Sequence, residues 1–342
     1  MKEEDAMTGR LLNWGILGCA GIARKAMIPA ITGSRNGRVA AVASRDAAKA
    51  RAFADELGIA RACGSYDELL RDPSVDVIYN PLPNHLHVPM TIAALAAGKP
   101  VLCEKPLGLS AAEVQLLQAA QRRFGLPVAE AFMVRFHPQW QAARDLLRSG
   151  RLGELRAIHT VFTYFNADPD NVRNRPELGG GGLYDVGCYA VNTARFLLEA
   201  EPEAAIGLFE RDPAFGTDRL TSGLVSFPGG ARLAFTCATQ AALTQEALII
   251  GTKGRLHIPV AFNPPPDMAA TIVFDDCRDL IGTGREVITL PPADQYRLLA
   301  EAFADTVLGQ AAALEDIASS ISNMRALDAL LRSATTGRWE TL

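Results

Sequence analysis

LLNWGILGCAGIARKAMIPAI, from Leu11 to Ile31, joins two hydrophobic patterns through a glycine turn. Leu11 to Leu17 is a short apolar run with the length of a buried strand, and Gly18 to Ile31 has the apolar spacing of a helix. A strand, a glycine turn and a helix in this order are the context that a dinucleotide-binding fingerprint requires. The stretch therefore predicts the start of a parallel α/β sheet that binds a nucleotide.

The glycine turn fits the fingerprint G-x-G-x-x-G/A with one departure. Gly18 takes the first position and Ala23 the last, whereas Ala20 stands at the middle position, where glycine normally lets the backbone approach a pyrophosphate. Gly21 follows directly. The candidates for cofactor binding in this turn are Gly18, Ala20, Gly21, Ile22 and Ala23. A plain tight turn is the alternative interpretation.

The next strand, Arg38 to Ser44, indicates which nucleotide is bound. An NAD site has Asp or Glu about 20 residues beyond the glycines, whereas an NADP site has a cation for the 2′-phosphate. Ser44 and Arg45 end this strand and Lys49 follows one helical turn later, so we expect NADP(H) in preference to NAD(H). Asp46 weakens this inference, because it could pair with Arg45 instead.

Strands and helices alternate as far as Phe124, which predicts the doubly wound parallel sheet of a Rossmann domain. The expected elements are helices Asp46 to Gly58, Ser65 to Arg71, His85 to Gly98 and Ser110 to Phe124, with strands Val75 to Tyr79 and the run from Val101. Pro81, Asn84 and His87 follow the first of these strands, at the sheet edge where ligands bind. They are candidates for cofactor contacts, although Asn84 could equally cap the helix.

The stretch VLCEKPLG, Val101 to Gly108, ends the later strand with a lysine between an acid and a proline. Pro106 disfavours helical backbone at Lys105, so we expect the ammonium group in a turn at the same sheet edge. Glu104 and Lys105 are therefore candidates for the cofactor site. A solvated loop lysine is the alternative interpretation.

After Pro127 the pattern changes, and we expect two domains, residues 1–128 and 129–342. Consecutive strands separated by turn residues predict that the second is an α+β domain with a large, mostly antiparallel sheet. The expected strands are Leu155 to Phe165, Ala204 to Leu208, Leu220 to Phe227, Arg232 to Thr239, Ala247 to Gly251, Thr271 to Phe274 and Glu286 to Leu290, and helices Ala293 to Leu308 and Ala312 to Ser333 follow. Apolar residues on both faces of several strands predict subunit association through an open sheet face.

Between the first two of these strands, GGGGLYDVGCY from Gly179 to Tyr189 runs from four glycines into a helix. The glycines permit close backbone approach and unusual φ values. Asp185 and Tyr189 are four residues apart, so they share one face of the expected helix. They are candidates for chemistry, and a structural hydrogen-bonded pair is the alternative.

Composition argues against several classes of function. With a net charge of −4 and a pI near 5.8, the chain lacks the basic field expected for binding nucleic acid. The first ten residues lack a secretory pattern and no apolar run could span a bilayer, so we expect a cytoplasmic protein. The six cysteines show no CxxC pair and the five histidines no metal motif, so we predict no metal.

Several short motifs, in their order along the chain, resemble the glucose-fructose oxidoreductase / inositol dehydrogenase / MocA family from Trp14 to about Trp339. These motifs are WGILGCAGIA, ASR, YNPLPNHLH, EKP, EAFMVRFHPQ, DPDN and GGGxxxDxGxY. Each motif alone is modest, but their joint order is specific. Within the family, the sequence is most similar to the branch of dimeric dihydrodiol dehydrogenases and NADP-dependent D-xylose dehydrogenases.

The resemblance places the family's EKP lysine on Lys105, its catalytic tyrosine on Tyr189 and the preceding aspartate on Asp185. It also implies a cis bond before Pro106 and association through the open sheet as a homodimer or homotetramer. A free tyrosine has a pKa of about 10, so as a base it needs a nearby cation. Lys105 supplies that charge if the two side chains meet.

The activity implied by the resemblance is hydride transfer between NADP(H) and a sugar, polyol or keto-sugar, as in an aldose 1-dehydrogenase or a trans-dihydrodiol dehydrogenase. Tyr189 would then be the acid and base, and Asp185 would bind a substrate hydroxyl or orient Lys105. Arg135 and His137 are candidates for the substrate pocket, with structural roles as the alternative. A dinucleotide-dependent glycosidase and a non-enzymatic dinucleotide-binding regulator are two further functions on the same fold.

Overall fold

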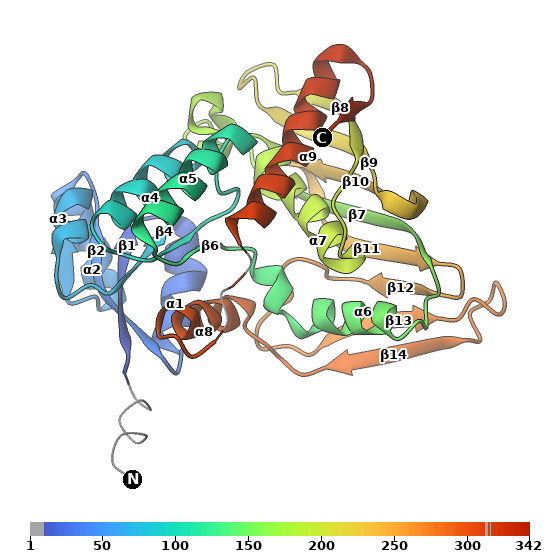
Figure 1. Cartoon of the computed structure of the whole chain (residues 1–342), viewed down its shortest axis with the longest axis horizontal. Helices are drawn as coiled ribbons and strands as arrows, with labels where there is room; N and C mark the ends of the chain where they lie inside the picture. The colour runs from blue at the N-terminus through green and yellow to red at the C-terminus, as the bar shows by residue number, and fades with distance from the viewer. Residues whose placement is uncertain (1–9, 312–313, 315) are drawn as a thin grey trace, which may run out of the picture. The chain divides into compact units, whose positions relative to one another are not determined.

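The computed structural model describes residues 10–311, 314 and 316–342, which form two compact units (Figure 1). The first unit takes the described chain up to Gly108, Ala112–Ala131 and the described part of Tyr296–Ser320. The second takes Leu109–Ala111, Phe132–Gln295 and Ile321–Leu342. We keep the boundary near residue 128 as a proposal for the folding domains. The two units differ from this boundary chiefly because the described part of Tyr296–Ser320 belongs to the first unit.

The first unit is built on a six-stranded parallel sheet in the order β3-β2-β1-β4-β5-β6. Its strands are β1 Leu12–Leu17, β2 Gly37–Ala43, β3 Arg61–Cys63, β4 Val77–Asn80, β5 Val101–Cys103 and β6 Val128–Glu130. Its helical segments are η1 Ala23–Met27, α1 Ile28–Thr32, α2 Ala47–Leu57, α3 Tyr66–Arg71, η2 Asn84–Leu86, α4 His87–Ala96, α5 Ala111–Phe124 and α8 Gln295–Val307. The predicted doubly wound parallel sheet is confirmed.

Local differences from the expected elements have simple causes. Strands β3 and β6 have three residues each, too few for a periodic pattern to reveal them. The expected helix from His85 is divided, because a 3₁₀ turn, η2, precedes α4 and Leu86 takes the N-cap position. Asn84 therefore opens η2 and does not cap α4.

The second unit is built on a nine-stranded sheet in the order β14-β13-β12-β11-β7-β10-β9-β8-β15. Its strands are β7 Leu155–Phe165, β8 Ala204–Arg211, β9 Asp218–Ser226, β10 Arg232–Ala238, β11 Gln240–Gly251, β12 Arg255–Ile258, β13 Ala270–Asp275, β14 Arg285–Leu290 and β15 Glu340–Thr341. Its helical segments are η3 Met133–Phe136, α6 Pro138–Arg148, η4 Val172–Asn174, η5 Pro176–Leu178, η6 Leu183–Gly187, α7 Cys188–Leu198, η7 Pro228–Gly230 and α9 Ile317–Thr336.

The large, mostly antiparallel sheet expected from the sequence is confirmed. Its parallel pair is β7 with β10, which are joined by a long crossover that includes α7. All seven expected strands are present, whereas the short strands β12 and β15 were not predicted. The expected start of the last helix, Ala312, lies outside the described residues.

The two faces of this sheet differ in their cover. Helices α6, α7 and α9 lie along one face (Figure 1), and the Ser333 hydroxyl of α9 accepts a hydrogen bond from the Gly207 N–H of β8 at 2.7 Å. Side chains of the covered face, such as Ile158 and Leu233, are buried. On the other face Leu208 and Leu224 of neighbouring strands are exposed, which is an apolar surface that the described residues do not cover.

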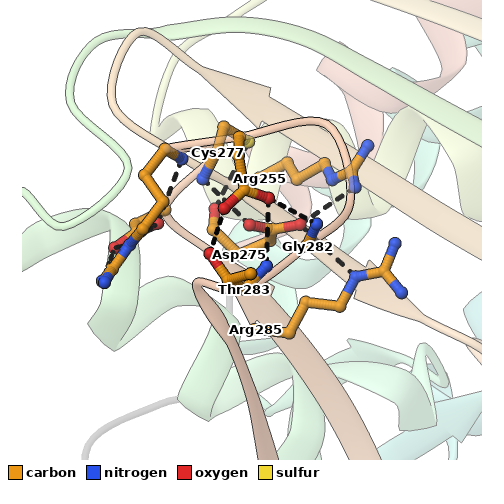
Figure 2. Close-up of polar contacts among 9 residues, drawn as sticks. Arg255, Asp275, Cys277, Gly282, Thr283 and Arg285 are labelled. Carbon is orange, nitrogen blue, oxygen red and sulfur yellow. Dashed lines mark hydrogen bonds and ion pairs between the residues drawn. The ribbon is translucent and has the colours of Figure 1, made fainter.

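The turn of the β13–β14 hairpin is held by carboxylates (Figure 2). Asp275 accepts hydrogen bonds from the Cys277 N–H and from Arg255 Nη2, both at 2.9 Å. Asp279 accepts them from the Gly282 and Thr283 N–H groups at 2.7 and 3.1 Å. Polar contacts therefore hold the turn of this hairpin.

Three properties of the described residues concern membrane spans, cysteines and metal sites. None of the described helices is long and apolar enough to cross a membrane. All six cysteines are free thiols, four of them buried, with Cys19 half-buried and Cys277 exposed. The described residues hold no cluster of three or more His, Cys, Asp or Glu side chains suited to a metal ion.

Candidate functional site

The glycine turn after β1 has the geometry that a dinucleotide pyrophosphate requires. Gly18 has a φ of +85°, and a Cβ there would lie 2.8 Å from Leu82 Cδ2, so both the backbone conformation and the packing require glycine. A Cβ on Gly21 would meet no protein atom within 4 Å, so this exposed position is open to a ligand. The helical segment that follows begins directly after this turn, so its first N–H groups lie beside the turn. These residues fit an NAD(P) pyrophosphate.

The end of β2 presents the cations expected near an adenosine ribose. Arg45 and Lys49 are exposed, and Arg45 opposes the rise that burial causes in the pKa of Tyr66, a residue that sequence reasoning missed. Asp46 caps α2, since its carboxylate accepts hydrogen bonds from two N–H groups, that of Lys49 among them at 3.0 Å. Ser44 is buried and its hydroxyl accepts from the Asp46 N–H at 3.2 Å. The position of the Asp46 carboxylate is explained by its capping of α2 and not by a pair with Arg45.

The turn that carries Lys105 is fixed from two sides. The buried Tyr79 hydroxyl donates a 2.6 Å hydrogen bond to Glu104, and Glu130 accepts one from the Leu107 N–H at 2.8 Å. Burial, and then Glu104, raise the pKa of Tyr79 well above its usual value. The peptide bond between Lys105 and Pro106 is cis, as the resemblance implied. Lys105 itself is half-buried at the carboxyl edge of β5.

His87 joins this turn to the loop after β4. Its ring is buried, with Nδ1 2.7 Å from the Pro106 carbonyl oxygen and Nε2 2.7 Å from the Leu82 carbonyl oxygen. Burial lowers the pKa of His87 to about 4, against the effect of the two carbonyl groups. Pro81 is buried in the same loop, and Asn84 is half-buried where the loop enters η2. His87 therefore holds the loops of the cofactor edge through their main chains.

In the second unit, Tyr189 lies in an aromatic environment. Its side chain is buried, with the ring of Phe132 at 5.4 Å in an edge-on arrangement and the rings of Phe162 and Phe262 at 5.6 and 5.8 Å. The hydroxyl lies 3.3 Å from the Met133 sulfur. Such walls restrict the ring to one orientation and exclude water from most of its surface.

Asp185 lies one turn before Tyr189 and is held by two donors. Arg173 Nε lies 2.8 Å from Asp185 Oδ2, and the Tyr164 hydroxyl donates to the same oxygen at 2.5 Å. Asp185 raises the pKa of Arg173, and burial together with Asp185 raises the pKa of Tyr164. Arg173 also interacts electrostatically with Tyr189, so one guanidinium serves both site residues. Neither Arg173 nor Tyr164 was expected at the site from the sequence.

The segment that carries Asp185 differs from the regular helix expected. Leu183–Gly187 forms a π-helical turn, η6, before the α-helix that begins at Cys188. Gly181 has a φ of +121°, and a Cβ there would lie 2.0 Å from Asp218 Oδ1. Asp218 also accepts a hydrogen bond from the Leu183 N–H at 2.7 Å. The glycines therefore let this buried carboxylate approach the start of η6, and π-helical turns are frequent at functional sites.

Arg135 and His137 are buried in the second unit. Arg135 Nε donates to Asn192 Oδ1 at 2.7 Å, and its guanidinium lies over the Phe196 ring at 5.5 Å. His137 is the N-cap of α6, where its Nδ1 accepts a hydrogen bond from the Gln139 N–H at 3.2 Å. Burial lowers the pKa of His137 to about 4. These contacts give both residues a structural part, and a substrate contact stays a prediction.

The predicted site residues thus form two groups. The first unit brings together the glycine turn, the cations after β2 and the turn of Lys105. The second unit brings together Asp185, Tyr189, Arg173 and Tyr164. That Lys105 and Tyr189 meet stays a prediction.

Two known family domains match this chain. Residues 12–132 match the family described as oxidoreductase family, NAD-binding Rossmann fold, and residues 140–257 match the GFO/IDH/MocA C-terminal domain. The chain belongs to the GFO/IDH/MocA oxidoreductase family. It is an NAD(P)-dependent oxidoreductase that acts on CH–OH groups.

Several relatives in the family span most of the chain. A D-xylose 1-dehydrogenase (NADP(+)) from Haloferax volcanii is 40% identical over 326 residues, 95% of this chain and 98% of the relative. A mouse trans-1,2-dihydrobenzene-1,2-diol dehydrogenase is 36% identical over 257 residues, 74% of this chain and 76% of the relative. The crystal structure of the 3-ketoreductase KijD10 from Actinomadura kijaniata, in complex with NADP and TDP-benzene, superposes with a TM-score of 0.88 at 29% identity. That superposition covers 94% of this chain and 98% of KijD10.

The N-cap role of His137 predicts a loss of stability in acid. The cap needs an unprotonated Nδ1, and His137 Nε2 has no hydrogen-bond partner among the described residues. Because the folded-state pKa of about 4 is below the unfolded value of 6.5, His137 favours folding above pH 6.5 and loses this contribution as the pH falls toward 4.

We expect His137→Asn, which keeps an acceptor at the N-cap but does not titrate, to reduce this pH dependence. Between pH 7 and 5 the unfolding free energy should fall by about 2 kcal/mol more in the natural protein than in the variant. Urea denaturation at both pH values measures this difference. The exposed His159 provides the control His159→Asn, and equal losses in all three proteins would contradict the assignment.

Proposed function

We propose that this enzyme transfers hydride between NADP(H) and a sugar, polyol or keto-sugar, with Tyr189 as acid and base and Lys105 as its electrostatic partner. The observation that carries the proposal is the placement of Tyr189. Its ring is fixed by aromatic neighbours, and its hydroxyl lies at a site that also contains an ion pair, Arg173 with Asp185. A phenol can exchange protons at such a site because a positive charge stabilises the phenolate.

The proton and the hydride follow separate routes in this mechanism. In oxidation, the Tyr189 oxygen takes the hydroxyl proton of the substrate while the carbinol carbon loses hydride and becomes a carbonyl. In reduction, Tyr189 returns the proton to the carbonyl oxygen. The nicotinamide, when bound, supplies or accepts the hydride. Lys105, from the turn held by His87 and Glu130, would stabilise the developing negative charge on oxygen.

The preference for NADP(H) rests on the end of β2. Arg45 and Lys49 are exposed there, and the carboxylate of Asp46 faces the helix that it caps. Two cations without a competing carboxylate suit a 2′-phosphate. The Haloferax and KijD10 relatives are described with NADP, in support of this preference.

The relatives support the proposed substrate class, which is sugars and related compounds with a hydroxyl or keto group. The names of the relatives include a xylose dehydrogenase, a dihydrodiol dehydrogenase and a 3-ketoreductase. We therefore propose to screen aldoses, trans-dihydrodiols and keto-sugars, free and nucleotide-linked, with both cofactors. Net turnover of free NADP(H) separates this activity from that of a glycosidase that regenerates its cofactor in each cycle.

The open face of the nine-stranded sheet supports a homodimer or homotetramer. Exposed apolar residues lie on one face of neighbouring strands, where Leu208 on β8 is diagonally opposite Leu220 and Leu224 on β9. Monomers rarely expose contiguous apolar surface of this kind.

A first test of this proposal is Tyr189→Phe, which removes the proton-transferring oxygen and keeps the ring. We expect kcat to fall by about 10²–10⁴-fold with nearly unchanged NADPH affinity, measured by fluorescence titration. Tyr184→Phe is the matched control, because it removes a hydroxyl that bonds the Leu109 carbonyl in the same segment. Full activity of the Tyr189 variant would refute the mechanism.

A second prediction concerns Arg45→Ala, which removes a charge-assisted contact to the 2′-phosphate. NADPH affinity should fall by about 10–100-fold while NADH affinity changes little, because such contacts contribute about 1.5–3 kcal/mol. Arg51→Ala is the control, since Arg51 lies further along the chain, on α2, and pairs with Asp55. Equal losses for the two cofactors would argue against the phosphate contact.

The third prediction tests the open face through Leu224→Glu, which places a charge at its exposed apolar surface. We expect the natural protein to be a dimer or tetramer in light scattering and this variant to have a lower mass. Leu116→Glu is the control, because Leu116 is exposed on α5 of the other unit. A monomeric natural protein would contradict the proposal.

A further inference from the structure

Arg173 lies in a loop that is tied to the glycine turn before Asp185. Asn171 Oδ1 accepts a hydrogen bond from the Arg173 N–H at 3.1 Å, and the Arg173 carbonyl accepts one from the Gly181 N–H at 2.9 Å. A Cβ on Gly180 would lie 2.5 Å from that carbonyl oxygen, so only glycine fits. The position of Arg173 is therefore determined by the same turn that sets the start of η6.

The side chain of Arg173 is only partly enclosed. It is 40% exposed, whereas the Asp185 side chain that it pairs with is 13% exposed. Its Nε is directed at Asp185 Oδ2, the oxygen that also accepts the Tyr164 hydroxyl bond. Two donors on one oxygen fix the carboxylate and favour its ionised form.

The titratable groups around Asp185 come from four elements of the unit. They are Tyr164 on β7, Arg173 on η4, Cys188 and Tyr189 on α7, and Cys237 on β10, with Asp218 of β9 facing Cys237. Of these groups, Arg173 is the cation. An ionised Asp185 without it would oppose a second negative charge on Tyr189.

We propose that Arg173 is a positioning residue, which holds Asp185 in place and offsets its charge so that Tyr189 can lose and regain its proton. This inference rests on the proposed acid and base role of Tyr189. It differs from the role given to Lys105, because Arg173 belongs to the same unit as Tyr189. Its charge therefore acts on the tyrosine before any substrate or cofactor is bound.

The experiment is the pH profile of kcat/KM for oxidation, with the best substrate of the screen. Activity rises with pH as the base loses its proton. In Arg173→Met and Arg173→Gln we expect this rise to occur about one pH unit or more higher, because an opposite charge at short range shifts such a group by about 1–3 units. At pH 7, kcat should fall by about 10-fold or more, with a smaller change in KM.

Two controls separate charge from structure. Arg173→Lys keeps the charge, so its rise should stay close to that of the natural enzyme. Arg175→Met removes an exposed arginine of the same loop, which pairs with Glu177, and should leave the profile unchanged. The glutamine variant keeps a hydrogen-bond donor for Asp185, so it provides the measurement if the methionine variant does not fold.

The outcomes distinguish this inference from the function on which it rests. An unshifted profile in the neutral Arg173 variants, together with an inactive Tyr189→Phe enzyme, overturns the role of Arg173 alone. A shift of equal size in Arg173→Lys overturns the inference that Arg173 acts through its charge. An active Tyr189→Phe enzyme overturns the proposed mechanism instead.

Discussion

A partly buried carboxylate must be paired, and in the second unit this requirement determines how the site is built. Asp185 lies one turn before Tyr189, where an unpaired negative charge would make the phenol harder to ionise. Arg173 and Tyr164 both bind its Oδ2, and they reach it from a loop and from a central strand. The glycines before η6 follow from the same requirement, because they let the loop of Arg173 and the buried Asp218 approach this segment. Pairing Asp185 therefore fixes the glycine turn as well as the charge near Tyr189.

The first unit positions its cation, Lys105, in a different way. Lys105 is in a turn whose acidic neighbour, Glu104, is anchored by the buried Tyr79 hydroxyl, and whose next residues are tied to Glu130 and His87. These contacts use main-chain groups and buried side chains, so they hold the turn through groups other than the ammonium of Lys105. His87 illustrates why a polar residue at a binding edge need not touch the ligand. Its ring lies between two carbonyl groups and positions the loops that carry other candidates.

Local patterns were sufficient to predict most of the fold, the turn that carries Lys105 and the helix that carries Tyr189. The strand, turn and helix at Gly18 and the consecutive strands after Leu155 depend on neighbours in sequence, so the type of both sheets was predicted correctly, whereas the short strands β3, β6, β12 and β15 were missed. Arg173 and Tyr164 were missed because tertiary packing, and not spacing, brings them to Asp185. The π-helical turn was missed for a similar reason, since its first N–H group, that of Leu183, donates to the buried and distant Asp218.

Strand β7 links the candidate site to the open face of the sheet. Because side chains alternate along a strand, Phe162 and Tyr164 are directed to the covered side, where they contact Tyr189 and Asp185, while Val161 and Phe165 belong to the opposite face. A shift of register by one residue would exchange these two sets. The pairing of β7 with β10 and β11 on its two sides prevents such a shift over most of its length. The same pairing therefore keeps aromatic walls beside Tyr189 and apolar side chains on the face proposed for subunit contact.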